Sequence, residues 1–120
     1  MAGLRLTEPA ERDIAGLLDW SERTLGPAAR QRHEVLVAAA LSDIAHDWRR
    51  AGSVKRDDLG AGWRIYHLQN SRQRARKAAG IVQSPRHILV YRLAAGDIVI
   101  VPRVLHDSMD FTRHLDATTE

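Results

Sequence analysis

One stretch, residues 84–106, constrains the fold of this 120-residue chain more than any other. Two runs rich in β-branched residues, 88–93 and 98–104, flank a short break that contains Gly96, and glycine adopts positive φ without strain. This pattern predicts a β-hairpin. Both runs carry apolar side chains at odd and at even positions, which is typical of strands covered on both faces. We therefore expect the hairpin at the centre of a sheet.

The first half of the chain has the periodicity of two amphipathic helices. Apolar residues at helical spacing predict one helix over about residues 8–24 and a second over about 27–48, with Trp48 in the register of the second stripe. Between them, Gly26-Pro27 combines a helix stop with a helix start. A break this short predicts that the two helices are antiparallel neighbours.

Shorter segments complete the pattern. Residues 4–6 predict a first strand, and the alternating residues 63–68 predict another. Residues 49–62 are polar, contain three glycines and predict a loop. Residues 71–80 fit either a short helical turn or a loop. Residues 107–115 predict one or two helical turns. The expected cap of these turns is Asp107 or Ser108, and the expected packing residues are Met109, Phe111 and Leu115.

The resulting order is strand, helix, helix, strand, strand, strand. It predicts a single α+β domain over residues 1–120, in which an antiparallel helical hairpin packs on a small antiparallel β-sheet and a short helix follows at the C-terminal end.

Composition excludes several classes of site. The chain has no cysteine, which rules out disulfides and thiolate metal ligands, and its six histidines lack the spacing of a metal motif. We find no glycine-rich strand–loop–helix element for a nucleotide, so no cofactor is expected. Without an apolar run of membrane length or a signal-like segment, the expectation is a soluble, cytoplasmic protein.

Positive charge is concentrated in one stretch. The net charge is only +3, but the segment from Arg72 to Arg92 carries six basic residues and no acidic one. Such a segment favours an anionic partner, either nucleic acid or an acidic protein surface. A solvated charged loop is the alternative.

Four segments carry a resemblance to a known family. They read LTEPAERDI at 6–14, LGP at 25–27, WRIYHL at 63–68, and PRHILVYR at 85–92 continuing to RVLHDSMD at 103–110 and RHL at 113–115. Together they resemble the RelE/ParE toxin superfamily, and the last segment is most similar to plasmid-stabilisation toxins of the ParE type.

The resemblance implies the toxin of a type II toxin–antitoxin pair, neutralised by a ParD-like antitoxin in a hetero-oligomer. Toxins of the ParE type poison DNA gyrase, whereas toxins of the RelE type cut mRNA on the ribosome. Both share one fold, so the fold cannot decide between the two targets. A third alternative is an inactive relative that retains only antitoxin binding.

Metal-independent RNA cleavage needs a general base, a general acid and cations around the phosphate. The candidates for such a site are His87 together with Arg86, Tyr91, Arg92, Arg103 and His106. The hairpin, however, offers Ile88 and Val90 where nucleases of the RelE type carry charged groups. We therefore predict a binding protein without catalytic residues.

If the protein acts by binding its target, the residues expected to contact that target are Arg86, Arg92, Arg103 and His106. Three of these four have a structural alternative. His106 could brace the turn into the last helix, and the arginines 86 and 103 could brace the sheet through Asp107 or Asp110.

The expected antitoxin surface combines apolar and basic residues. Trp20 lies off the main stripe of its helix, so we expect it to be exposed as an anchor beside Leu17. The basic part of this surface is expected at Arg74, Arg76 and Lys77. The alternative for Trp20 is that it folds over the edge of the helical hairpin.

Overall fold

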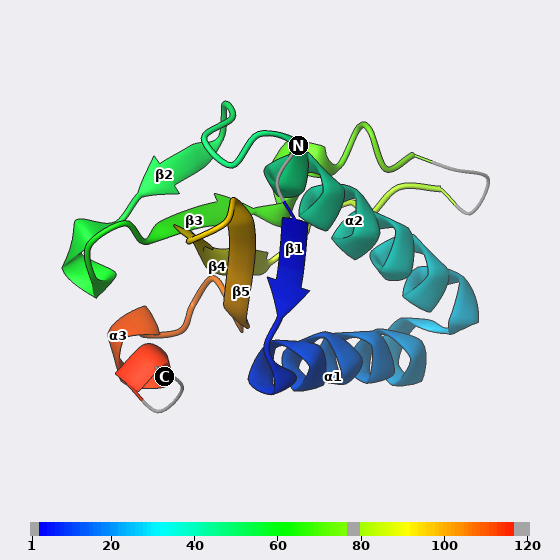
Figure 1. The fold of residues 1–120 in the computed structure, drawn as a ribbon. Helices are drawn as coiled ribbons and strands as arrows, with labels where there is room; N and C mark the ends of the chain where they lie inside the picture. Colours follow the sequence, from blue (N-terminus) through cyan, green and yellow to red (C-terminus); the bar gives the residue numbers. More distant parts are fainter. Residues whose placement is uncertain (1–2, 77–79, 117–120) are drawn as a thin grey trace.

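A five-stranded sheet lies between two helical layers in the computed structural model, which describes residues 3–76 and 80–116 (Figure 1). The strands, in spatial order, are β1 (Gly3–Leu6), β5 (Ile98–His106), β4 (His87–Ala94), β3 (Arg64–His67) and β2 (Ser53–Lys55). The predicted hairpin, β4 and β5, therefore occupies the interior of the sheet. Neighbouring strands are antiparallel except β1, which pairs in parallel with β5. The α+β order predicted from the sequence is confirmed.

The hairpin is buried on both faces, as its composition predicted. Leu89 and Tyr91 belong to the larger core beneath the long helices, and Ile88 and Val90 belong to a second core on the opposite face. All four are at most 7% exposed. Because successive side chains of a strand point to opposite faces, these strands can be apolar at every position.

Two long helices cover one face of the sheet. They are α1 (Glu8–Leu25) and α2 (Pro27–His46), joined through Gly26 at φ 95°. The predicted second helix was too long, since it ends at His46 and the next residue, Asp47, is extended with φ −149°. Trp48 nevertheless packs against the core from the turn that follows, and its carbonyl accepts a hydrogen bond of 2.7 Å from Tyr91.

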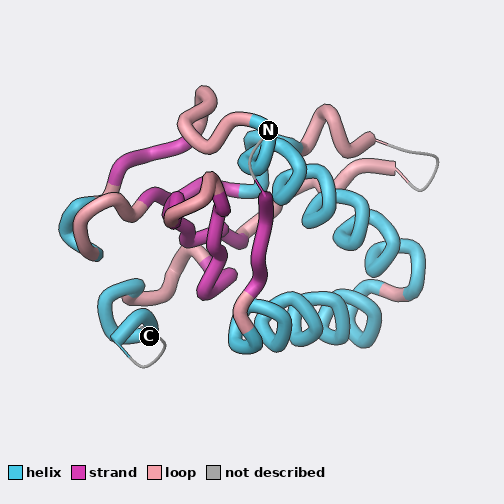
Figure 2. The backbone as a smooth tube through the Cα atoms, in the orientation of Figure 1, coloured by secondary structure: helices cyan, strands magenta, loops and turns pink. Residues whose placement is uncertain are grey.

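The opposite face is covered by the short helix α3 (Phe111–Asp116), and Figure 2 shows it on the other side of the strands from the long helices. Phe111 and Leu115 pack into the second core, as predicted. Two details of the prediction were wrong. The cap is Asp110, whose side chain accepts from the Thr112 N–H at 3.2 Å, and Met109 is 43% exposed because the turn at 107–109 points it away from that core.

The predicted loop over residues 49–62 contains two elements. These are the edge strand β2 and a 3₁₀ helix at Asp57–Leu59. Strand β2 is only three residues long and largely exposed, so it has no hydrophobic alternation and forms through its pairing with β3. In the stretch 71–80, turns continue from the 3₁₀ helix Leu68–Ser71 as far as Ala75, and residues 77–79 lie outside the described residues.

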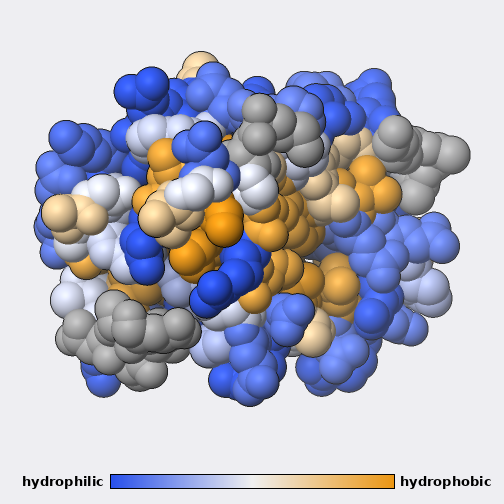
Figure 3. Space-filling view, viewed as in Figure 1, coloured by the Kyte–Doolittle hydropathy of each residue, from blue (hydrophilic) through white to orange (hydrophobic). Residues whose placement is uncertain are grey.

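The β1 edge of the sheet carries exposed apolar side chains. Leu4 is 40% and Ile98 is 37% exposed. Figure 3 shows hydrophobic residues gathered over β1 and β5 within a hydrophilic surround. The apolar surface at this edge is continuous with the core between the sheet and the helices, which Leu6 joins from β1.

Strand β5 is longer than β1, so its outer edge needs another partner. β1 covers only Ile98 to Val101. Beyond that point, Asp13 of α1 accepts the Val104 N–H at 2.9 Å and both Nε and Nη2 of Arg103, at 2.6 and 3.0 Å. Arg103 also donates from Nη1 to the His114 carbonyl of α3, at 3.4 Å. Asp13 and Arg103 together thus link both helical layers to the sheet.

We expect Asp13→Ala to lower the free energy of unfolding by about 2–3 kcal/mol, since it leaves a largely buried guanidinium and a strand N–H without their acceptor. Urea denaturation monitored by circular dichroism measures the loss. The control is Asp19→Ala on the same helix, where the carboxylate is exposed and makes only a 3.4 Å ion pair with Arg30. Equal effects of the two substitutions would contradict this role of Asp13.

Candidate binding groove

A groove of about 1150 Å³ lies between α1, the start of α2, the segment 80–87 and the end of β5. Part of its wall is apolar and accessible. Trp20 is 48% and Leu25 is 58% exposed, and Met109 lies on the wall as well. Leu17 and Val82 line it from the edge of the core. Exposed aromatic and aliphatic side chains beside a concave surface are typical of a protein interaction site.

The ionisable residues that line the groove are all basic. Three arginines and three histidines line it, and the lining residues that the structure describes include no Asp or Glu. These six residues are Arg32, Arg76, Arg86, His33, His87 and His106. A concave surface that lacks carboxylates and carries several cations attracts an anionic partner.

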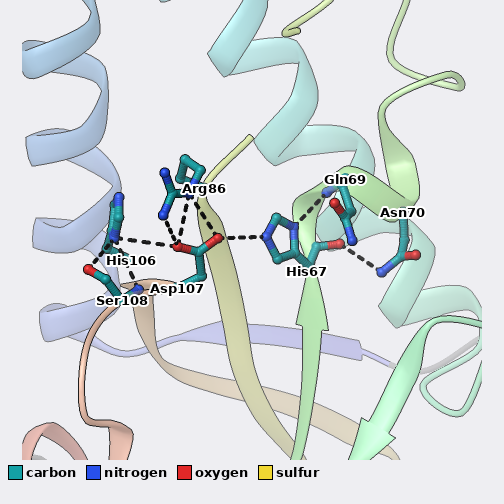
Figure 4. A network of polar contacts seen from close by, with 7 residues as sticks. All are labelled: His67, Gln69, Asn70, Arg86, His106, Asp107 and Ser108. Atoms are coloured by element: carbon teal, nitrogen blue, oxygen red, sulfur yellow. Dashed lines mark hydrogen bonds and ion pairs between the residues drawn. The ribbon is translucent and has the colours of Figure 1, made fainter. Parts of the chain in front are cut away.

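One carboxylate, Asp107, organises the end of the groove (Figure 4). Arg86 donates to it from Nε and Nη2, at 2.8 to 3.0 Å, and His67 donates from Nε2 at 3.2 Å. The Arg86 guanidinium first, and then the His67 ring, lower the pKa of Asp107 to about 2. Its stabilising effect is therefore complete above pH 4 and is lost as the pH falls toward 2. The bidentate pair fixes Arg86 at the groove wall.

The rings of His87 and His106 lie edge to face at the bottom of the groove, with centroids 5.3 Å apart. Burial first, and the neighbouring His106 second, lower the pKa of His87 to about 4, so His87 is neutral at physiological pH. His106 accepts from the Ser108 N–H at 3.2 Å, and its Nδ1 lies 2.8 Å from Ser108 Oγ. These bonds brace the turn toward α3, which is the structural alternative that the sequence suggested for His106.

The residues considered for RNA cleavage do not converge. Arg86 and His106 share the groove, but Arg92 lies on the other face with its guanidinium over the Trp63 ring, at 5.6 Å. Arg103 is paired with Asp13, rather than with Asp107 or Asp110. Tyr91 is fully buried under the long helices. Its hydroxyl contacts Ser53 and donates to the Trp48 carbonyl, and burial raises its pKa.

Only some of the residues expected to bind the antitoxin are accessible at the groove. Trp20 is exposed and Arg76 lines the groove. Leu17, by contrast, is 5% exposed, because it packs into the core and presents only an edge to the groove. Arg74 bonds at 2.7 Å to the buried Asp43 and at 2.9 Å to the Ala39 carbonyl. Lys77 lies outside the described residues.

Several groove residues were missed by the sequence reasoning. Arg32 and His33 follow Ala29 at helical spacing, so all three lie on one face of α2 and reach the groove together. The helical spacing predicts that these three residues share one face of α2. It does not predict which other element of the fold that face contacts. The role of Asp13 carried no local signal, because its partner Arg103 lies 90 positions away in the chain. The pairing of Arg86 with Asp107, by contrast, is one of the structural alternatives that the sequence suggested.

Within residues 3–76 and 80–116, no three His, Asp or Glu side chains are grouped closely enough to hold a metal ion. The helices in this described part of the chain include none that is long and apolar enough to cross a membrane.

Comparison with protein families gives one finding. Residues 4–111 match the family model described as "ParE toxin of type II toxin-antitoxin system, parDE". A search of curated proteins finds no match. The family match covers every element from β1 to β5 and reaches the first residue of α3.

The buried His87 predicts acid sensitivity. Its pKa is about 4 in the folded protein against 6.5 ordinarily, so the unfolded chain binds more protons between these values and stability falls as the pH drops through that window. We expect a loss of about 1–2 kcal/mol between pH 7 and pH 5 that His87→Gln removes. Urea unfolding at both pH values measures it. The control His46→Gln, at an exposed position of α2, should keep the full loss.

Because Arg74 contacts a buried carboxylate, its replacement is predicted to reduce the free energy of unfolding more than replacement of Arg76. We expect Arg74→Ala to lower the free energy of unfolding by about 1–2 kcal/mol, since the buried Asp43 loses one of its two cations and keeps only Arg50. Arg76→Ala should change it by less than about 0.5 kcal/mol. Thermal and urea denaturation compare the two. A neutral Arg74→Ala would mean that Arg50 and the Ser71 hydroxyl together satisfy Asp43.

Proposed function

The chain belongs to the ParE toxin family of type II toxin–antitoxin systems, and on that premise we propose that it inhibits DNA gyrase when free and is neutralised by a ParD-like antitoxin. The family match over residues 4–111 is the observation that carries the proposal. An antitoxin partner follows from the family itself, whereas ParD-like character and the gyrase target belong to the proposal.

We propose further that the toxin acts by binding and not by catalysis. The support is the dispersal of the candidate nuclease residues. Tyr91 is in the core, Arg92 is on the far face and Arg103 is in an ion pair with α1, so none of them can join Arg86 and His106 around one phosphate. A hydrolytic site needs its acid, base and cations within hydrogen-bond reach of the same group.

The positions of the candidate residues in the structure reduce the set of proposed target contacts. Of the four candidates, Arg86 and His106 line the groove and are available to a partner. Arg103 is largely buried against Asp13, with a side chain 16% exposed. Arg92 remains a candidate only for a partner that reaches the other face of the sheet.

The antitoxin is proposed to bind the helical hairpin at the groove. Trp20 and Leu25 offer the apolar anchors, and Arg76 offers a cation beside them. Buried aromatic anchors surrounded by a polar rim carry most of the energy of such interfaces. Cations at the rim increase the association rate with an acidic partner.

One observation favours a second candidate, the ribosome-dependent mRNA interferase. Arg86, His87 and His106 lie together in the groove, so a cation and two imidazoles could face one phosphodiester. The low pKa of His87 weakens this candidate, because a general base works best with a pKa near the operating pH.

The decisive experiment is a supercoiling assay. Toxin freed from its antitoxin is expected to inhibit the supercoiling of relaxed plasmid by purified DNA gyrase, and Arg86→Ala is expected to need about tenfold more protein for equal inhibition. The control Arg23→Ala changes an exposed arginine of α1 outside the groove. Unaffected supercoiling with excess wild-type toxin would refute the gyrase proposal. Cleavage of a reporter mRNA in a translating extract, lost in Arg86→Ala and His106→Ala, would support the interferase instead.

A further inference from the structure

The short helix α3 covers only part of its side of the sheet. Figure 1 shows it beside the end of β5, away from the turn that joins β4 to β5. Near that turn, Val99 and Val101 belong to the core beneath the long helices, so Ile98 and Ile100 point to the α3 side. Ile98 is 37% exposed and Ile100 is half-buried. This end of the sheet therefore presents apolar side chains that are part of neither core described above.

Two arginines share this part of the sheet. Arg5 of β1 and Arg92 of β4 are both register partners of Ile100, one on each side of β5. Residues directly opposite each other in neighbouring strands point to the same face, and the Arg92 guanidinium over the Trp63 ring identifies that face as the α3 side. Two strand spacings separate the arginines, so their Cα atoms lie about 10 Å apart. We call Arg5, Arg92, Ile98 and Ile100 the open sheet face.

The positive charge of the open sheet face is not balanced within the sheet. All five strands lack Asp and Glu. Among the described residues, the side chains of Arg5 and Arg92 form neither an ion pair nor a hydrogen bond, and Arg92 has only its contact with the Trp63 ring. Asp97, the nearest acidic residue in the sequence, belongs to the hairpin turn and pairs with neither arginine. Cations that no internal carboxylate neutralises attract an anionic partner.

An acidic protein surface fits the open sheet face better than other partners do. Its carboxylates can pair with Arg5 and Arg92 while its aliphatic side chains cover the two isoleucines. Nucleic acid presents phosphates at close, regular spacing and would leave the isoleucines uncovered. A second copy of this chain would bring arginine against arginine, because in a twofold dimer the same patch meets itself.

We propose that the open sheet face is a contact surface for the target of the toxin and binds an acidic patch on that protein. This inference rests on the proposed function for the existence of a protein target. It adds a surface that is separate from the groove, because none of the four residues of the open sheet face lines the groove. The target is then recognised on the α3 side of the sheet as well as at the groove.

The test measures toxicity and antitoxin binding separately for each variant, because the proposal affects only the first. Toxicity is growth arrest when the full chain is expressed without antitoxin. Antitoxin binding is the Kd for the antitoxin encoded beside the toxin gene, measured by calorimetry. Arg5→Glu is expected to relieve growth arrest, to weaken the binding of purified DNA gyrase about tenfold, and to leave the antitoxin Kd unchanged. Ile98→Glu should do the same, since it places a carboxylate against an acidic partner.

Matched variants separate a lost contact from a lost fold. Arg23→Glu makes the same charge change at an exposed position of α1 and should keep full growth arrest. Arg5→Lys keeps the positive charge and should keep most of the toxicity. Melting temperatures verify that each variant is folded. We expect no change for Arg5→Glu, since the Arg5 side chain is exposed and makes no polar contact with the described residues.

Three results would overturn the inference. The first is full growth arrest in both Arg5→Glu and Ile98→Glu. The second is a loss of antitoxin affinity as large as the loss of toxicity, which would assign the face to the antitoxin. The third is binding of a 30-base-pair DNA duplex that Arg5→Glu abolishes while gyrase affinity measured without DNA is unchanged, which would assign the face to nucleic acid. Failure of the gyrase proposal is distinguishable, because wild-type toxin then leaves supercoiling unaffected, whereas growth arrest still reports on the open sheet face whatever the target.

Discussion

The bond between Asp13 and the outer edge of β5 sets the geometry of the whole domain. Because β5 extends beyond the end of β1, its outer edge has backbone N–H groups that no strand pairs. The Asp13 side chain of α1 accepts the hydrogen bond from one of them, the Val104 N–H. The same carboxylate holds Arg103, which also donates to a carbonyl of α3, so polar contacts of this one strand link the two helical layers. The position of α1, and with it one wall of the groove, follows from this bond.

A second carboxylate positions the opposite wall. Asp107 gathers Arg86 and His67 at the point where the hairpin strands end, and its N–H also donates to the Arg86 carbonyl. The groove thus lies between two walls that are each anchored by an internal acid. Of the arginines that line the groove, Arg86 is balanced by Asp107, a carboxylate that is not itself among the lining residues.

Local patterns predicted most of the fold. The hairpin, both long helices and the break at Gly26 follow from periodicity and from residues with particular backbone preferences. What could not be predicted depends on contacts between distant residues. Asp13 is 91 positions from its partner Val104, and strand β2 forms through its pairing with β3. Leu17 and Trp20 differ in exposure although both lie on α1. For the site, the sequence reasoning assigned Trp20 and Arg76 to one surface and Arg86 and His106 to another, whereas in the structure all four line one groove.

The parallel pairing of β1 with β5 has a consequence for biosynthesis. The first strand of the domain finds its partner only in the last, with Gly3 opposite Ile98, and α1 finds the acceptor site for Asp13 on that same strand. Closing so long a loop requires that nearly the whole chain has left the ribosome. A nascent chain therefore cannot complete its sheet, or fix α1 against it, until translation is almost finished.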